Sequence, residues 1–316
     1  MKRITAILLA VLFILPSCIG CAEQAAYRRE ESAGRDKDSY PYIVRTPSAV
    51  WHLSKSDMDL LGEDAYCERL FSILDDMEAD FAEARAALKG YISEDVPPVD
   101  IYTDFCNKAE ASKAGDAFYR SLGNYIKLFK GWDTACACLL HEYVHYLTFH
   151  CAEPETQPGF WAEGIADYVS MYACKNRLSR SVNLGRDLSV QPPAMLEMAW
   201  DKTEGCLHPR LVWLGWAVIY ARGYGVGQTY FAVKNEMVER TAELQDNPNP
   251  QDLTFYEASG MIAWLLETHG PETVFGNWDL DPEQMETVYG KAFPDLYRDW
   301  AVWNEEQCVL SGIIIL

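Results

Sequence analysis

Apolar residues recur along this chain with two different spacings, which separates predicted helices from predicted strands. Residues 57–90 repeat apolar positions every three or four residues, with acidic residues between them, and Gly90 ends this predicted helix. Shorter segments alternate apolar and polar residues and predict strands at 42–44, 50–53, 99–103 and 124–129. Longer apolar segments predict helices at 134–149, 160–174, 211–220, 255–270 and 293–300. The pattern predicts an α+β protein that is mostly helical, with a small mixed sheet in its N-terminal part and a helical C-terminal part.

Residues 1–20 have the pattern of an export signal. Two basic residues precede the apolar run 6–15, which is too short to span a bilayer. The run leads to Cys18, and its surroundings are those of a cysteine that is lipidated after cleavage of a lipoprotein signal; Cys21 is a second candidate. Ordinary secretion with cleavage near Ala22 is the alternative. In either case we expect an extracytoplasmic protein, anchored to the membrane through its N-terminal lipid or secreted.

Composition divides the remainder of the chain. Residues 21–40 are polar and charged, which predicts a flexible linker between the anchor and the folded part. We expect one domain over 41–308, with its chemistry at 133–174 and its C-terminal helical part at 211–308. Residues 309–316 form an apolar tail that is too short to cross a membrane.

The charge and the cysteines narrow the class of protein. The formal net charge is −20, and it becomes −22 once the two basic residues of the export signal are removed. Such acidity argues against nucleic acid, and against an anionic lipid surface, as the binding partner. The chain has ten cysteines, and an oxidising compartment would permit disulfides. Buried free thiols are the alternative, and the sequence leaves both open.

The candidate chemistry centres on the pattern H-E-x-x-H at 141–145. Residues four apart lie on one face of a helix, so that the imidazoles of His141 and His145 can reach one cation. Glu142 stands beside them and is a candidate general base for a water molecule activated at that cation. We expect Asp133 to be the N-cap of this helix. Two ordinary histidines on a core helix are the alternative to a metal site.

Glu163, eighteen residues after His145, begins a segment with two acidic residues. A catalytic zinc ion takes three protein ligands and keeps one position open, and Glu163 can supply the third ligand from the start of another helix. Asp167 lies one helical turn further and is placed to accept the free N–H of a ligand histidine. Two surface acids on a helix are the alternative.

H-E-x-x-H followed by Glu163-Gly164-Ile165-Ala166-Asp167-Tyr168 resembles the gluzincin zinc metallopeptidases, and in style the peptidase-MA-like domains of exported bacterial proteins. The resemblance covers about 58–305, densely at 124–174 and 254–270. One departure is that Phe160 occupies a place where those domains usually have tryptophan, and Trp161 follows it. The resemblance implies a zincin-like fold.

The resemblance also implies a role for each residue of the motif. His141, His145 and Glu163 match the ligands of one catalytic Zn²⁺. Glu142 matches the general base, and Asp167 matches the acid that orients a ligand histidine.

Two further features complete the expected site. Tyr256 stands on the 255–270 helix where related aminopeptidases have a tyrosine that stabilises the oxyanion, which makes it the candidate for that role. Tyr220, Tyr224 and His208 are the rival candidates. We expect the strand 124–129 to be the edge of the sheet, where an extended substrate can add its backbone.

These observations predict an exported zinc-dependent metallopeptidase that hydrolyses peptide or protein substrates. The segment by which aminopeptidase relatives recognise a free N-terminus is absent between residues 115 and 129, which favours an endopeptidase. The alternatives are a cell-surface binding protein that keeps the fold with little or no turnover, and a zinc hydrolase that acts on other bonds.

Overall fold

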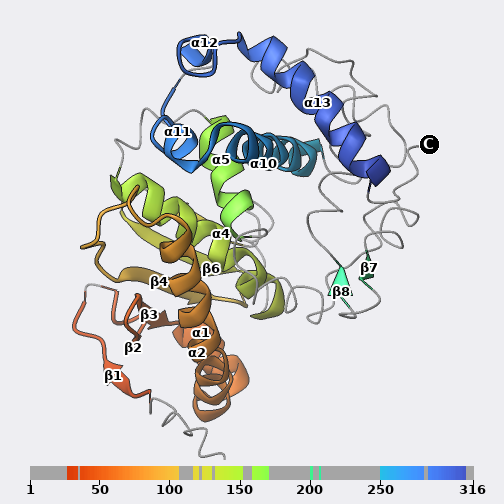
Figure 1. The fold of residues 1–316 in the computed structure, drawn as a ribbon. Coiled ribbons are helices and arrows are strands. Elements are labelled where there is room, and N and C mark those ends of the chain that lie inside the picture. Colours follow the sequence, from red (N-terminus) through yellow and green to blue (C-terminus); the bar gives the residue numbers. More distant parts are fainter. Residues whose placement is uncertain are drawn as a thin grey trace, which may run out of the picture.

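The computed structural model describes residues 27–34, 36–106, 117–120, 123–129, 132–151, 159–170, 200–201, 206–207, 250–280 and 284–310. Helices account for 56% of these residues, and the main sheet is small and mixed (Figure 1). The coarse prediction of a mostly helical protein with a small mixed sheet in its N-terminal part is therefore confirmed. The export signal, both candidate lipidation sites and the apolar tail beyond residue 310 lie outside the described residues.

The main sheet has six strands in the spatial order β1-β2-β3-β4-β6-β5. The strands are β1 (Arg29–Glu31), β2 (Tyr42–Arg45), β3 (Ala49–Leu53), β4 (Val99–Asp104), β5 (Ala117–Arg120) and β6 (Tyr125–Phe129). Strands β3, β4 and β6 run parallel, whereas β1, β2 and β5 join by antiparallel pairing. A separate pair, β7 (Trp200–Asp201) and β8 (Cys206–Leu207), is antiparallel.

The structure corrects the predicted edge of the sheet. Strand β6 corresponds to the predicted strand 124–129, but it lies between β4 and β5 and is therefore an inner strand. The edge next to it is β5, whose four residues pair antiparallel with β6 from Ala117 opposite Leu128 to Arg120 opposite Tyr125. A strand this short, without regular alternation, gives only a weak pattern in the sequence.

The predicted linker is also wrong in part. Arg29–Glu31, inside 21–40, forms β1 and pairs with β2. All three residues of β1 are exposed, so the composition of this strand matches that of a linker although its backbone is paired. Charged side chains are common on edge strands because they hinder pairing with other chains.

The predicted helix 57–90 is divided into two. Helix α1 (Lys55–Leu61) ends at Gly62, and α2 (Glu63–Ala87) begins immediately after it. Gly62 has φ +85°, a conformation that glycine adopts without steric cost. The apolar period continues across the break, which explains why the sequence pattern indicated one helix.

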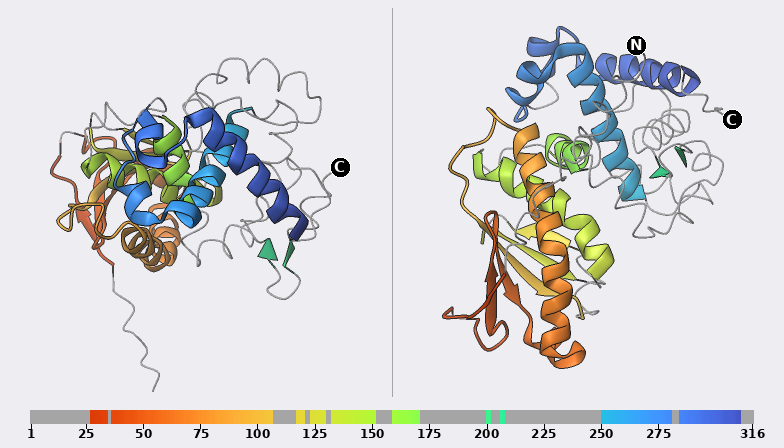
Figure 2. Two further views of the ribbon diagram at one scale, coloured as in Figure 1. Left: turned by 45° about the horizontal axis from the view of Figure 1, so that its top comes forward. Right: turned by 60° about the horizontal axis from the view of Figure 1, so that its bottom comes forward.

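The core lies on one face of the sheet, under α2 and α4 (Trp132–Cys151) (Figure 2). Inward side chains of the strands are fully buried, and so is every third or fourth residue of α2. The buried residues of these elements include Trp51, Leu53, Ile101, Ile126, Leu128, Tyr66, Leu70, Leu74, Phe81 and Ala84. Helix α4 begins at Trp132, so Asp133 lies inside its first turn and the predicted N-cap at Asp133 is wrong.

Together with α5 (Gly159–Tyr168), the other described helices form a second layer (Figure 1). They are α10 (Pro250–His269), α11 (Pro271–Phe275), α12 (Met285–Tyr289) and α13 (Phe293–Leu310). Helix α10 packs along α5, and the indole N–H of Trp161 donates to the carbonyl of Leu280 at 2.8 Å. These contacts set the position of α5, which carries Glu163.

Gly164 lies where α5 packs closely against α10, so Gly164→Ala is expected to destabilise the protein. An added methyl group would lie 2.6 Å from Cδ1 of Ile262 and 3.1 Å from the backbone carbon of Ala258. Overpacking of this kind costs about 1–3 kcal/mol, which urea unfolding would measure.

Gly260→Ala is the matched control for this prediction, since both glycines are inside helices. At Gly260 the nearest atom to an added methyl group is in Trp300, at 3.4 Å, which is ordinary contact. Alanine improves helix propensity there by about 0.5–1 kcal/mol, so this variant should be as stable as the wild type or more so. Equal stability of the two variants would contradict the tight packing at Gly164.

Candidate metal centre

Helix α4 carries both histidines of the motif, and buried tyrosines hold its orientation. The hydroxyl of Tyr143 accepts a hydrogen bond from Nε of Arg85 on α2 at 2.6 Å. The hydroxyl of Tyr146 donates to the carbonyl of Pro97, just before β4, at 2.6 Å. These two contacts fix the rotation of α4 about its axis, and with it the direction of the two imidazoles.

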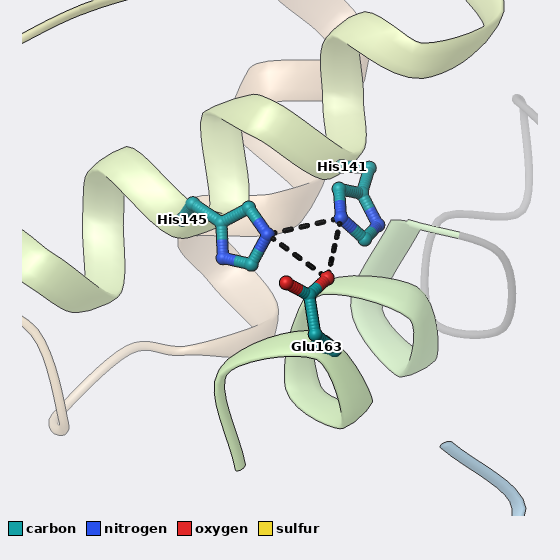
Figure 3. A group of neighbouring side chains, drawn as sticks. All are labelled: His141, His145 and Glu163. Carbon is teal, nitrogen blue, oxygen red and sulfur yellow. Dashed lines mark hydrogen bonds and ion pairs between the residues drawn. The ribbon is translucent and has the colours of Figure 1, made fainter. Parts of the chain in front are cut away.

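Three candidate ligand side chains converge from two helices (Figure 3). Nε2 of His141 lies 2.9 Å from Nε2 of His145. Oε2 of Glu163, on α5, lies 3.2 Å from the first nitrogen and 3.4 Å from the second. The three atoms therefore form a nearly equilateral triangle, with one corner supplied by a segment eighteen residues away along the chain.

This triangle fits the ligand set of a zinc ion. Imidazole nitrogen and carboxylate oxygen are preferred zinc ligands, and three of them with one open position are typical of catalytic sites. Ligand atoms in tetrahedral array around zinc lie about 3.3 Å apart, because each is about 2.0–2.1 Å from the metal. The three observed separations fall close to that value, so His141, His145 and Glu163 could hold one Zn²⁺.

Asp167 contacts the far side of His141. Its Oδ1 lies 2.7 Å from Nδ1 of His141, and the carboxylate is 8% exposed. Because a carboxylate accepts, Nδ1 carries the proton and Nε2 is directed at the ligand triangle. The predicted pairing of Asp167 with a ligand histidine is thus present in the geometry. Nδ1 of His145 is buried and has no hydrogen-bond partner among the described residues.

The ionisation of the triangle follows from these contacts. Burial lowers the pKa of His141, but its hydrogen bonds with Asp167 and Glu163 and the nearby negative charge outweigh burial, so its pKa lies well above the usual value. Burial raises the pKa of Glu163, yet hydrogen bonds and charge from both histidines outweigh burial and hold that pKa well below its usual range. The raised pKa favours a second proton on His141, at Nε2, when metal is absent. Zinc competes with that proton, while the proton on Nδ1 stays in the contact with Asp167.

Glu142 follows His141 in α4, adds negative charge near that histidine and has a different partner. Its Oε2 accepts a hydrogen bond from the backbone N–H of Tyr119 on β5, with 2.6 Å between nitrogen and oxygen. Glu142 is half-buried and is not one of the three residues of the candidate ligand group. One N–H occupies only one of the two carboxylate oxygens, so the other is left to accept from water.

The candidate oxyanion residue is described only in part. Tyr256 lies on α10, whose backbone is described at that position, but its side chain is outside the described residues. The rivals Tyr220, Tyr224 and His208 also lie outside them. Among the described cysteines, Cys67, Cys106 and Cys138 are reduced thiols.

Sequence reasoning missed Tyr119. The sequence pattern predicts no strand at 117–120, although its aromatic pair Phe118-Tyr119 is a weak indication of one. Tyr119 joins the site through a backbone group, and a backbone donor has no signature in the sequence.

Asp167→Asn is expected to weaken zinc binding about 10- to 100-fold, because an amide nitrogen can face Nδ1 and disturb the tautomer of His141. Competition with a chromophoric chelator would measure the dissociation constant. Asp100→Asn is the matched control, since Asp100 contacts His52 in the same manner at 2.8 Å but away from the site. An unchanged zinc affinity in Asp167→Asn would show that the contact between Asp167 and His141 has no influence on zinc binding.

Comparison of the chain with protein-family models, with curated proteins and with solved structures found no match. None of the described helices is both long and apolar enough to cross a membrane.

Proposed function

We propose that this chain is an exported zinc-dependent peptidase with a zincin-like, gluzincin-type site. The observation that carries the proposal is the triangle of His141, His145 and Glu163, whose atoms are 2.9–3.4 Å apart, with Glu142 beside it. A binding protein that only needed a metal for stability would require no carboxylate adjacent to the ligands. The H-E-x-x-H motif at 141–145 and Glu163 are also the residues by which the chain resembles gluzincins.

Each residue of the proposed site has a separate role in hydrolysis. Zinc, when bound, acts as a Lewis acid that polarises a carbonyl and lowers the pKa of water. Glu142 takes a proton from the attacking water and later passes it to the leaving amine. Asp167 keeps His141 in the tautomer that leaves Nε2 free. We assign the stabilisation of the oxyanion to Tyr256, on the strength of the resemblance alone.

The position of β5 supports peptides or proteins as the proposed substrate class. This strand is the outermost strand of the described sheet beside α4, so it takes the role we expected of 124–129. An extended peptide can add its backbone to the edge groups of β5 other than the N–H of Tyr119, which donates to Glu142. We propose an endopeptidase acting on peptides or proteins outside the cytoplasm, with an N-terminal lipid at Cys18 or Cys21. The net charge of −20 disfavours nucleic acid as a partner.

The proposal is tested by measuring metal content and peptide cleavage together. The purified protein is expected to bind one zinc per chain and to cut members of a broad peptide library. A chelator should stop cleavage, and added zinc should restore it. Stoichiometric zinc without any cleavage would favour the binding protein, and hydrolysis of ester or sugar substrates alone would favour the other zinc hydrolase.

A further inference from the structure

Strand β5 makes two kinds of contact with α4, and both involve Tyr119. The backbone N–H of Tyr119 donates to Oε2 of Glu142 at 2.6 Å. The ring of Tyr119 stacks on Phe149, two turns further along α4, with centroids 5.7 Å apart and planes at 18°. The edge strand is therefore attached to the metal-binding helix at the proposed general base and again beyond the second histidine.

Tyr119 is itself held in place on the sheet side. Its hydroxyl donates to Oδ1 of Asn124 at 2.8 Å, across the turn that joins β5 to β6. Asn124 has φ +55°, which places this turn residue in the left-handed region. The residue that contacts Glu142 is thus fixed from both sides, by the turn and by the helix.

The direction of the Tyr119 N–H follows from the strand pairing. Along an antiparallel strand, successive residues direct their backbone groups alternately toward the partner strand and away from it. Because the N–H of Tyr119 is bonded to Glu142, it points away from β6, while those of Phe118 and Arg120 point toward β6. The N–H of Tyr119 is therefore on the outer edge of the sheet, where Glu142 of α4 accepts its hydrogen bond. The bond to Glu142 removes no hydrogen bond from the pairing of β5 with β6.

A hydrogen bond from an N–H to a carboxylate is charge-assisted and directional. Glu142 is joined to its helix by two methylene groups and has several rotamers. A fixed donor on one oxygen selects one of them and thereby sets where the other oxygen points. General-base catalysis requires the carboxylate to lie within hydrogen-bond reach of the proton that it removes.

We infer that Tyr119 is a positioning residue: its backbone N–H orients the carboxylate of Glu142 and couples the edge strand to the general base. This inference rests on the proposed peptidase function for its catalytic meaning. The contact itself can be tested without any activity.

The first measurement is hydrogen exchange of the Tyr119 amide in the zinc-free protein. Wild type should protect this amide although it lies on a sheet edge. Glu142→Ala should speed its exchange about tenfold or more, because the acceptor is gone. Glu142→Gln is the matched control and should retain protection, since its amide oxygen still accepts. Equal exchange in wild type and Glu142→Ala would overturn the inference.

The second measurement removes the donor. Tyr119→Pro deletes the N–H at an edge position that faces away from the ladder, where proline is tolerated. Tyr119→Ala loses the same ring but keeps the N–H, so the difference between the two variants isolates the donor. We expect kcat about tenfold lower in Tyr119→Pro than in Tyr119→Ala, with similar KM and equal zinc content.

The outcomes separate this inference from the proposed function. Protection lost in Glu142→Ala together with an inactive wild type would contradict the peptidase while supporting the contact. Equal kcat for Tyr119→Pro and Tyr119→Ala in an active enzyme would overturn the positioning role. If Tyr119→Pro does not fold, the exchange rate of the Tyr119 amide in wild type and Glu142→Ala tests the contact without this variant.

Discussion

Glu142→Gln is expected to lower kcat by about 10²–10⁴-fold, the usual contribution of a general base. Glutamine has nearly the same shape as glutamate but cannot take the proton from the attacking water. Its amide oxygen still accepts from the N–H of Tyr119, so the 2.6 Å contact to β5 and the local structure should survive. The loss should therefore appear in turnover and not in folding.

Initial rates on a cleaved peptide, together with zinc content and thermal unfolding, measure this effect. Glu272→Gln, on the exposed part of α11, makes the same chemical change away from the site and should leave the rates unchanged. A Glu142→Gln variant that turns over as fast as wild type, with full zinc content, would exclude Glu142 as the base and with it the proposed mechanism.

Glu163→Gln is expected to lower zinc affinity by more than about 100-fold. Removal of the hydrogen-bond partner of a ligand histidine costs about 10- to 100-fold, and removal of a ligand should cost more. The substitution replaces a carboxylate oxygen, 3.2 and 3.4 Å from the two Nε2 atoms, by a neutral amide that is a poor zinc ligand. The burial and contacts of α5 should be unaffected.

Zinc-dependent stabilisation provides the measurement for this variant. At a hundredfold excess of zinc over the dissociation constant, wild type gains about 2.7 kcal/mol, which raises its melting temperature. Glu163→Gln should lose this shift. Glu142→Gln, with the same substitution one residue from a ligand, should keep it. Zinc stabilisation that persists in Glu163→Gln would mean that Glu163 is not a ligand.

The candidate metal ligands could be selected from the sequence because most of their geometry is local. His141 and His145 share a face of any helix, whatever surrounds it. Glu163 was identified as a candidate by its place in a second helix, and the structure places its Oε2 within 3.4 Å of both Nε2 atoms. The pairing of Asp167 with His141 follows from the same two helices, since Asp167 is one turn beyond Glu163.

Several fold predictions failed for a common physical reason. Each of them depends on which backbone groups form hydrogen bonds with one another. The three cases are the edge position of 124–129, the linker at Arg29–Glu31 and the unbroken helix across Gly62. Hydropathy patterns report the burial of side chains, and they do not specify the strand that pairs with a given backbone. The charged strand β1 is the clearest example, because its composition is that of a solvated linker.

The sequence by itself determined the candidate site: two histidines on one helical face, a carboxylate between them, and an acidic segment downstream. Tertiary structure decided the rest. The approach of α5 to α4, set by the close contact of Gly164 with α10, brings Glu163 to the histidines. The edge position of β5 brings the N–H of Tyr119 to Glu142. Both depend on packing between segments far apart in the chain, and the donor is a backbone group that every residue except proline carries.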